Sequence, residues 1–345
     1  MVKYTIERIL LAAITTFIIL TLTFFLMKQL PFYPLAGTDE SKFAFFDYQV
    51  ALGYVIEFKF PKEGYGELLW KYTDASNTPH YYYLKPAFDQ YILWLKGIFT
   101  EFNWGASLYI KPNVDSMVLI ASRLPTTIKV NLPAAILSVP FGIALGVWAA
   151  LKKNKLTDHI ISTVIMIFIS VPSFIMITIL LYLFAFQWHL LPSSWPTSSH
   201  SVAMQIKGYI LPTMALSFGS ICGYCRFTRA ELTEVMSSDF LLLARTKGLT
   251  KSQSIVRHAM KNAMVPILPS ILAEVIGLLG GSMILESLYG IPGVGTLYTT
   301  AISQSDYNVL LADMSLYTII GLVSGVFLDL SYGFIDPRIR MGARK

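Results

Sequence analysis

Long runs of consecutive apolar residues constrain this chain more than any other feature of its sequence. The first run, residues 9–27, contains no charged residue and follows Lys3 and Arg8. A helix rises about 1.5 Å per residue, so a run of this length spans about 30 Å of hydrocarbon. Hydrophobic residues make up 54% of the chain and charged residues only 14%. Because so few charges could not cover that much apolar surface in water, we expect the chain to lie in a membrane.

The first apolar run could also be the apolar part of a secretory signal peptide. It is longer than such a region usually is, and the residues that follow it, Met27 to Leu30, offer no small-x-small cleavage site. We therefore expect residues 1–30 to form an uncleaved first transmembrane helix. The basic residues before the run indicate that the N-terminus lies in the cytoplasm.

Residues 31–117 differ from the rest of the chain because they are polar and rich in aromatic side chains. They hold ten acidic residues against seven lysines, a balance that suits the outer side of a membrane. Their aromatic residues include Trp70, Trp94 and Trp104, and so many aromatic side chains disfavour disorder. We predict a small extracytoplasmic domain of mixed structure, inserted after the first helix.

Five further apolar segments follow, at residues 127–151, 160–186, 209–224, 265–285 and 308–330. Basic clusters come after the first, third and last of them. Six spans with both termini in the cytoplasm place all of these clusters on one side of the membrane. We therefore predict an all-α polytopic membrane protein with six transmembrane helices. Residues 118–345 form its five-helix core, with a cytoplasmic loop at residues 226–262.

Proline occurs within several of the predicted spans, at Pro133, Pro140, Pro172, Pro212, Pro266 and Pro269. Proline removes a hydrogen bond from a helix, and the carbonyl that it leaves free needs another partner. We expect kinked helices, which are common in transporters and also in other membrane proteins.

The basic loop at residues 226–262 carries local signals for two short helices. Residues 239–247 have the length of a helix of about two turns, and Gly248 suits the left-handed conformation that ends a helix. Thr250 and Gln253 then match a capping box, which begins a second helix. The loop should therefore present a helix, a glycine and a second capped helix as one shaped surface.

The sequence contains no recognisable motif for catalysis or for nucleotide binding. The phosphate-binding pattern G-x-x-x-x-G-K-[ST] is absent, as are H-E-x-x-H and G-x-S-x-G. No second ligand at metal spacing accompanies four histidines in or beside loops, His159, His189, His200 and His258. We expect these histidines to be solvated or hydrogen-bonded, and we predict neither an enzyme nor a metal site.

Cys222 and Cys225 lie three residues apart in one apolar segment, where packing is favoured over a disulfide or a metal site.

The charge of the chain indicates its class of partner. The net charge is +6, but lysine and arginine are unevenly distributed. This distribution indicates orientation in a membrane and argues against binding to nucleic acid.

Acidic residues within or at the ends of predicted spans are candidates for a translocation pathway. Glu274 lies about ten residues into the fifth span, Glu286 ends it, and Asp329 lies near the inner end of the sixth. For Glu286 and Asp329, the position near a membrane interface favours capping or packing. For Glu274, a role in the pathway and a role in packing both remain open.

Several motifs occur in a fixed order from the basic loop to the end of the chain. Tyr224-x-Arg226-x-x-Arg229 is followed by Asp239-Phe240, by ARTKGL at residues 244–249 and by RHAMKNA at residues 257–263. GGSMILESLYGIPGVG at residues 280–295 and DPRIR at residues 336–340 come next. Together these motifs resemble those of the oligopeptide/dipeptide-type branch of ABC transporter permeases, the inner-membrane components of binding-protein-dependent importers.

The sequence departs from the pattern of that family at three places. Leu242 and Leu243 stand before Ala244, where the glutamate of the family's cytoplasmic "EAA" loop is expected. Tyr289 stands where phenylalanine is usual, and residues 31–89 are longer than the compact outer loop of many members.

The resemblance implies the type I ABC importer permease fold and a non-catalytic subunit in the cell membrane. The implied partners are a homologous second permease, two ATPase subunits that hold ATP and Mg²⁺, and an extracytoplasmic peptide-binding lipoprotein. The implied cargo is a peptide, with oligopeptides expected first and dipeptides, nickel or sugars as alternatives.

The resemblance also implies roles for individual residues. The short helix would dock in a groove of an ATPase, where the small Ala244 and Gly248 would allow close approach. The residues implied in coupling are Asp239, Phe240, Ala244, Arg245, Lys247, Gly248 and Leu249. Glu274 and Glu286 are the candidates for the translocation pathway.

Three interpretations compete with an ATP-driven importer. A channel or an ion-coupled carrier would work without ATPases. A membrane-anchored receptor or scaffold would carry its activity in residues 31–117. The basic loop could also be held on anionic lipid without coupling to a partner.

Overall fold

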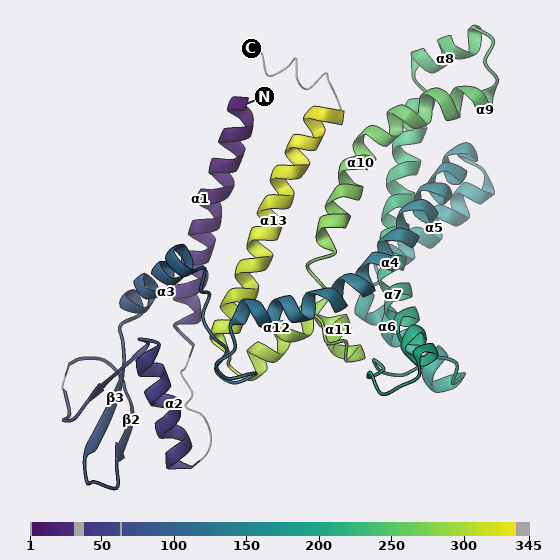
Figure 1. Cartoon of the computed structure of the whole chain (residues 1–345). Helices are drawn as coiled ribbons and strands as arrows, with labels where there is room; N and C mark the ends of the chain where they lie inside the picture. The colour runs from purple at the N-terminus through teal and green to yellow at the C-terminus, as the bar shows by residue number, and fades with distance from the viewer. Residues whose placement is uncertain (1, 31–37, 63, 336–345) are drawn as a thin grey trace. The chain divides into compact units, whose positions relative to one another are not determined.

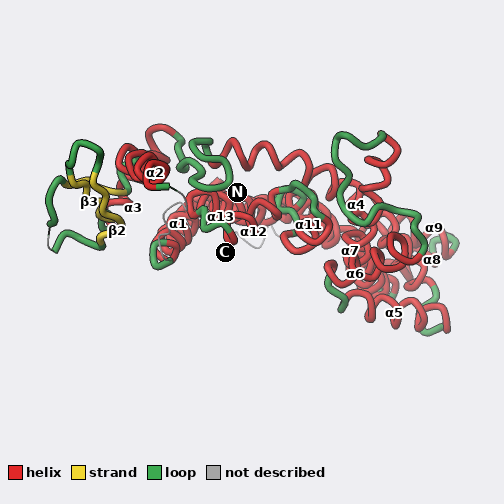
Figure 2. The backbone as a smooth tube through the Cα atoms, turned by 90° about the horizontal axis from the view of Figure 1, so that it is seen from below, coloured by secondary structure: helices red, strands yellow, loops and turns green. Residues whose placement is uncertain are grey.

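The computed structural model describes residues 2–30, 38–62 and 64–335 and is mostly helical (Figure 1). Strands occur in one region of the described chain, between α2 and α3, as the tube in Figure 2 shows. The elements up to α3 are α1 (Val2–Met27), α2 (Asp39–Ala51), β1 (Val55–Phe58), β2 (Leu68–Thr73), β3 (Pro79–Leu84) and α3 (Ala87–Glu101). They are followed by α4 (Ser116–Leu151), α5 (Leu156–Ile169), α6 (Ser173–Leu180) with a π-helical continuation (Leu181–Gln187), α7 (Val202–Met236) and α8 (Asp239–Thr246). The last are α9 (Lys251–Ser254), a π-helical turn (Ile255–Ala259), α10 (Met260–Gly277), α11 (Met283–Tyr289), α12 (Val294–Ser303) and α13 (Tyr307–Ile335).

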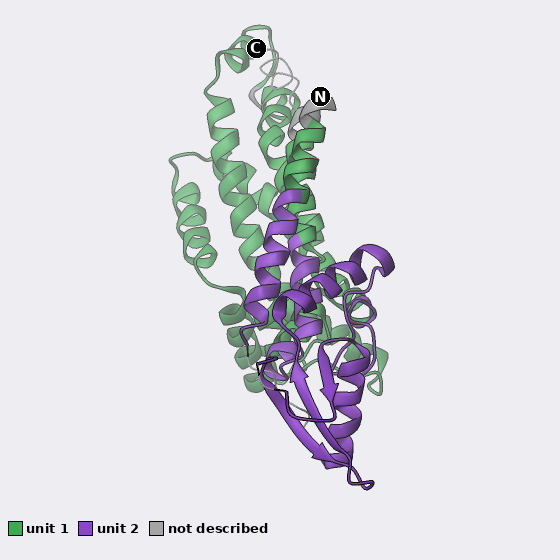
Figure 3. Ribbon diagram, turned by 90° about the vertical axis from the view of Figure 1, so that its left-hand side faces the viewer, with its two compact units in different colours: residues 1–13, 122–299, 319–345 green, residues 14–121, 300–318 purple. Residues whose placement is uncertain are grey.

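The chain divides into two compact units, coloured separately in Figure 3. Unit 1 comprises residues 1–13, 122–299 and 319–345, and unit 2 comprises residues 14–121 and 300–318. Unit 2 therefore combines the second half of α1 and the polar stretch after it with a short segment from near the other end of the chain.

A three-stranded antiparallel sheet in the order β1-β3-β2 is the centre of the polar stretch. Aromatic side chains form its core: the Phe46 ring stacks on Tyr82 with centroids 5.0 Å apart and on Trp70 at 5.3 Å. Phe45 and Val55 are buried in the same cluster. The segment is thus of mixed helix and strand structure, because its aromatic residues supply enough apolar surface to fix it.

A buried carboxylate in unit 2 joins residues that are far apart in the sequence. Asp306, which precedes α13, accepts hydrogen bonds from the Ser107 hydroxyl at 2.6 Å and from the backbone N–H groups of Leu108, Tyr109 and Ile110 at 3.0–3.2 Å. Asn308 adds a hydrogen bond from its side-chain amide to the carbonyl of Ala106 at 2.8 Å. These contacts fix residues 106–110 against the start of α13, although nearly 200 residues separate them.

Four helical segments of the described chain are long and apolar enough to cross a membrane: Thr5–Met27, Ser116–Leu151, Ile255–Gly277 and Tyr307–Ser331. A fifth span results if α5 and the helix Ser173–Gln187 are counted together, although they are bent by 99° at the break between them. α7 contains the predicted fourth span, residues 209–224, but is not among these segments. The number of six spans therefore stays a prediction.

The structure corrects the bounds of two predicted spans. Residues 160–186 are not one helix, because the chain breaks before Pro172, whose ring fixes its own backbone and disfavours a helical residue before it. The predicted span at 265–285 ends at Gly277, and α11 begins separately at Met283. Gly281 lies between them with φ +62°, a conformation that continues neither helix.

The prolines of the other predicted spans do not interrupt their helices. α4 runs through Pro125, Pro133 and Pro140, α7 runs through Pro212, and α10 runs through Pro266 and Pro269. Glycine instead sets how closely α4 and α7 pack: a Cβ at Gly142 would lie 2.6 Å from Cβ of Tyr224, and one at Gly146 would lie 2.6 Å from the Cys225 carbonyl oxygen. Cys222 and Cys225 are free and buried with Ile165, which confirms their role in packing.

Candidate functional site

The basic loop folds into the two short helices that its sequence predicts. α8 ends at Thr246, and Gly248 follows with φ +93°. The backbone N–H of Thr250 donates to Oε1 of Gln253 at 3.1 Å, and the N–H of Gln253 donates to Oγ1 of Thr250 at 3.3 Å. These reciprocal bonds confirm the capping box. α8 and α9 lie beyond the ends of α7 and α10 (Figure 1).

One side of α8 packs inside the chain. Leu241 is buried in a cluster with Leu232 of α7 and with Ile255 and Ala259 at the start of the helix that continues as α10. Ala244, one helical turn after Leu241, is also buried. The small side chain of Ala244 therefore packs within this chain.

The opposite side of α8 exposes large apolar residues. Leu242 and Leu243 are 63% and 56% exposed, and Phe240 is exposed beside them. The side chains of Arg245 and Lys247 are exposed at the end of the helix. We call these five residues the α8 face. Asp239 and Gly248 are also exposed, whereas Leu249 is half-buried.

Two residues of the Tyr-x-Arg-x-x-Arg motif are held inside unit 1. The Arg229 guanidinium donates to both carboxylate oxygens of Asp158, at 2.5 and 2.8 Å. The Tyr224 hydroxyl donates to the carbonyl of Ser270 at 3.2 Å, which links α7 to α10. Arg226, by contrast, is exposed. The motif therefore holds the helices that support α8.

Glu286 lies in a packing network rather than on an accessible surface. Its side chain is 2% exposed, and its carboxylate accepts hydrogen bonds from the Thr127 hydroxyl at 3.0 Å and the Thr296 N–H at 3.1 Å. Burial raises the pKa of Glu286, although these hydrogen bonds act in the opposite direction. The structure therefore places Glu286 where the packing interpretation puts it.

Glycines make the space that the Glu286 carboxylate occupies. A Cβ at Gly293 would lie 2.4 Å from Oε2 of Glu286, one at Gly281 would lie 2.7 Å from Oε1, and one at Gly295 would lie 3.0 Å from Oε2. Gly281, Gly293 and Gly295 are thus required by a close approach between side chain and backbone.

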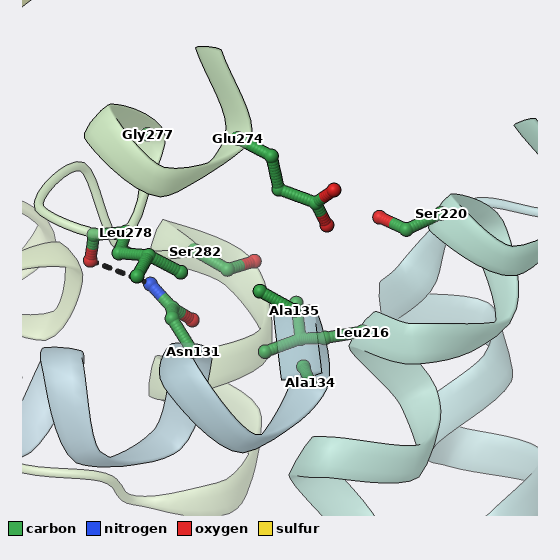
Figure 4. A pocket seen from close by; sticks show the side chains of 10 residues that line it. Asn131, Ala134, Ala135, Leu216, Ser220, Glu274, Gly277, Leu278 and Ser282 are labelled. Carbon is green, nitrogen blue, oxygen red and sulfur yellow. Dashed lines mark hydrogen bonds between the residues drawn. The ribbon is translucent and has the colours of Figure 1, made fainter. Parts of the chain in front are cut away.

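Glu274 lies at a pocket of about 240 Å³ within unit 1 (Figure 4). Residues from α4, α7, α10 and the turn before α11 line it, including Asn131, Ser220 and Ser282. Oε1 of Glu274 accepts a hydrogen bond from the Ser138 hydroxyl at 3.1 Å. The Asn131 amide donates to the carbonyl of Leu278 at 2.9 Å, which fixes the end of α10 beside the pocket. Glu274 and Glu286 are therefore in different surroundings.

The structure describes Asp329 and the four histidines near loops, but not the last motif of the sequence. Asp329 forms an ion pair with Arg8, with 3.0 Å between Oδ2 and Nη1, which ties the first helix to the last. The four histidines near loops, His159, His189, His200 and His258, are exposed. The DPRIR motif at residues 336–340 lies outside the described residues.

Comparison with known proteins gives matches over most or all of the chain. Residues 142–341 match the family described as binding-protein-dependent transport system inner membrane component. The chain is 34% identical to the dipeptide transport system permease protein DppB of Lactococcus lactis subsp. cremoris, over 99% of this chain and 100% of that one. It is 32% identical to DppB of Bacillus subtilis, over 99% of both chains. It is 31% identical to the oligopeptide transport system permease protein OppB of Escherichia coli K12, over 99% of this chain and 100% of that one.

Proposed function

Because the chain belongs to the family of binding-protein-dependent transport system inner membrane components, we propose that it is the membrane-spanning permease subunit of an ATP-driven importer of peptides. Its similarity to dipeptide and oligopeptide permeases over nearly its whole length supports this cargo class. We assign oligopeptides as the first cargo and dipeptides as the alternative.

The proposed complex contains this chain, a homologous second permease, two ATPase subunits and an extracytoplasmic peptide-binding lipoprotein. ATP and Mg²⁺ bind to the ATPases, and this chain itself performs no catalysis. Both of its termini lie in the cytoplasm, and residues 31–117 face the binding protein on the outer side of the cell membrane.

The exposed apolar side chains of the α8 face carry the proposal that α8 is the coupling helix. Exposure of Phe240, Leu242 and Leu243 to water does not stabilise the loop. A partner surface that covers these side chains would remove their apolar area from water, which is favourable. Arg245 and Lys247 would bind acidic or carbonyl groups at the edge of the same surface. Gly248 provides the turn that presents the helix.

The inward side of α8 supplies the connection to the membrane helices. Leu241 packs with Leu232 of α7 and with Ile255 before α10, so a displacement of α8 by the ATPases would move these helices with it. Ala244 belongs to this connection rather than to the docking surface. Closure of the ATPases on ATP would then switch the permease between inward-open and outward-open states.

Co-purification of the whole complex tests the proposal. Leu242→Asp and Leu243→Asp should remove the ATPases from the purified complex while the two permeases stay together. Glu234→Ala, which changes an exposed residue of α7 outside the α8 face, should leave the complex intact. Full retention of the ATPases in both aspartate variants would reject α8 as the coupling helix.

Uptake measurements on the reconstituted complex test the cargo. Labelled dipeptides and pentapeptides should both be compared with nickel and a sugar, in the presence of the binding protein and ATP. Uptake of pentapeptides supports oligopeptides, uptake of dipeptides alone supports the alternative, and uptake of neither contradicts a peptide importer.

A further inference from the structure

The pocket beside Glu274 combines a carboxylate with an environment that offers it no positive charge. Its lining residues are Asn131, Ala134, Ala135, Leu216, Ser220, Glu274, Gly277, Leu278, Gly281 and Ser282, and they include no lysine, arginine or histidine. Among the residues that the structure describes, none gives Oε2 of Glu274 a hydrogen bond, and this oxygen is shielded from solvent by the protein. One carboxylate oxygen therefore has no hydrogen-bond partner, and a ligand in the pocket would contact it only after a rotation of the Glu274 side chain.

In the part of the chain that the structure describes, no lysine, arginine or histidine forms an ion pair with Glu274. Ser138 of α4 donates a hydroxyl to Oε1. The Tyr224 hydroxyl of α7 lies within hydrogen-bond reach of the Glu274 carboxylate and of the Ser270 carbonyl, to which it donates at 3.2 Å. An ionised carboxylate within a membrane protein is costly without a cation. A positively charged ligand would therefore be favoured here.

The shape and the lining of the pocket select the kind of cation. A volume of about 240 Å³ far exceeds the roughly 30 Å³ that one water molecule occupies in the liquid. Small residues, Ala134, Ala135, Gly277 and Gly281, leave this room. A Ca²⁺ ion would require six to eight oxygen ligands, whereas an ammonium group has three donors. The Glu274 carboxylate and the Ser220 hydroxyl, which lie toward one another in Figure 4, can accept from an ammonium group.

We propose that the Glu274 pocket binds the protonated amino group of the peptide during its passage through the permease. This inference rests on the proposed function, because it assigns the ligand group within the same transport reaction. The pocket would hold the amino group at the Glu274 carboxylate, after a rotation of that side chain, and at the Ser220 hydroxyl, and the small residues would accommodate the adjoining part of the peptide.

A cycle of changes on the protein and on the peptide tests this assignment. Uptake by the complete reconstituted transporter is measured for one peptide with a free N-terminal amine and for the same peptide with that amine formylated. Both peptides are supplied at concentrations that saturate the binding protein. The preference of the binding protein for one of the two peptides is the same with every permease variant. It therefore cancels when the ratio of free-peptide to formylated-peptide uptake is compared between variants. Glu274→Gln should lower uptake of the free peptide about tenfold, since the amide keeps an acceptor oxygen but loses the negative charge that strengthens its bond to the ammonium group, and should leave uptake of the formylated peptide unchanged.

Two further variants keep the result decisive. Glu274→Asp retains the charge and should retain most of the preference for the free amine, while Glu234→Gln removes an exposed carboxylate of α7 and should behave as the unmodified chain. A peptide with an internal lysine and a formylated N-terminus shows whether the amino group of a side chain can substitute.

The outcomes separate the two proposals. Equal effects of Glu274→Gln on the free and the formylated peptide, or no effect on either, overturn the ammonium site and leave the peptide importer standing. If the unmodified complex takes up neither peptide, the proposed function itself is wrong. Receptor-stimulated ATP hydrolysis identifies a variant that has failed to assemble, and in that case the comparison between Glu274→Asp and the unmodified chain decides the question.

Discussion

The Arg229 guanidinium is fixed to the carboxylate of Asp158 by two hydrogen bonds, from Nε to Oδ1 at 2.5 Å and from Nη2 to Oδ2 at 2.8 Å. Asp158 is buried at the start of α5 and also accepts from the N–H of Asn154 at 2.9 Å. The pair therefore joins α5 to α7. The second arginine of the Tyr-x-Arg-x-x-Arg motif therefore holds two helices of this chain together.

Replacement of Arg229 should destabilise the protein far more than replacement of its neighbour Arg226. Arg229→Ala leaves the buried Asp158 carboxylate without its partner, at a cost of about 3 kcal/mol. Arg226 is exposed, so Arg226→Ala should cost less than about 0.5 kcal/mol. Thermal melting of the purified protein in detergent measures both, and equal melting temperatures for the two variants would contradict the assignment.

Asp306→Ala should loosen the segment at residues 106–110. The variant removes the acceptor for the Ser107 hydroxyl and for three consecutive backbone N–H groups, and each buried donor left without a partner costs about 1–3 kcal/mol. Hydrogen exchange followed by mass spectrometry should show faster exchange at Leu108, Tyr109 and Ile110. Asp47→Ala, which removes an exposed carboxylate from α2, should leave those amides unchanged.

Gly293→Ala should prevent correct folding around Glu286. The added methyl group would lie 2.4 Å from Oε2 of Glu286 and 2.5 Å from Oγ1 of Thr127, so the variant should lose several kcal/mol or fail to accumulate. Gly223→Ala on α7 meets nothing within 4 Å and is the matched control. The amount of monodisperse protein after purification distinguishes them, and a normal yield of Gly293→Ala would show that the carboxylate can move aside.

The turn between β2 and β3 should weaken in acid. Hydrogen bonds from the Ser76 hydroxyl and the Thr78 N–H lower the pKa of Asp74 from 3.8 to about 2. A lowered pKa means that the ionised form is favoured in the folded state, so its stabilising effect is present above about pH 4 and is lost as the pH falls toward 2. Hydrogen exchange at Thr78 should therefore differ between the unmodified chain and Asp74→Ala at about pH 5, and the difference should shrink at about pH 2. A difference that stays constant with pH would rule out ionised Asp74 as its source.

Gly248→Ala should disturb the end of α8 through the backbone alone. Gly248 has φ +93° and open space where a Cβ would lie, so the strain of that conformation, about 1 kcal/mol, is the expected cost. Gly248→Asn should cost less, because asparagine adopts positive φ more readily than alanine. Hydrogen exchange along α8 measures the effect, and the opposite order of the two variants would contradict it.

The sequence predicted the features that depend on neighbouring residues. The end of α8 before Gly248 and the Thr250–Gln253 capping box follow from the chemistry of those residues, and both are present. The residues next to Pro172, Pro133 and Pro140 did not indicate which of these prolines would end a helix and which would lie within one. Whether a proline kinks a helix or ends it depends on what surrounds the freed carbonyl, and of these three prolines Pro172 is the one that lies directly before a new helix.

The features that the sequence analysis missed depend on contacts between distant residues. Asp306 and Leu108 are 198 residues apart, and no local pattern marks them as a pair. Leu241 lies three residues before Ala244, on the same side of the helix, and indicates that this side could face inward. Leu242 and Leu243 make the opposite side apolar as well, so the sequence does not decide which side is buried. Only the packing of Leu241 against Leu232 and Ile255 decides between them.

The close fit of Gly281, Gly293 and Gly295 around the Glu286 carboxylate has an evolutionary consequence. No one of these four positions can accept a larger residue while the others keep theirs. A homologous sequence with a side chain at position 293 should therefore also have replaced the acid at position 286, and such paired replacements can be sought in sequences alone.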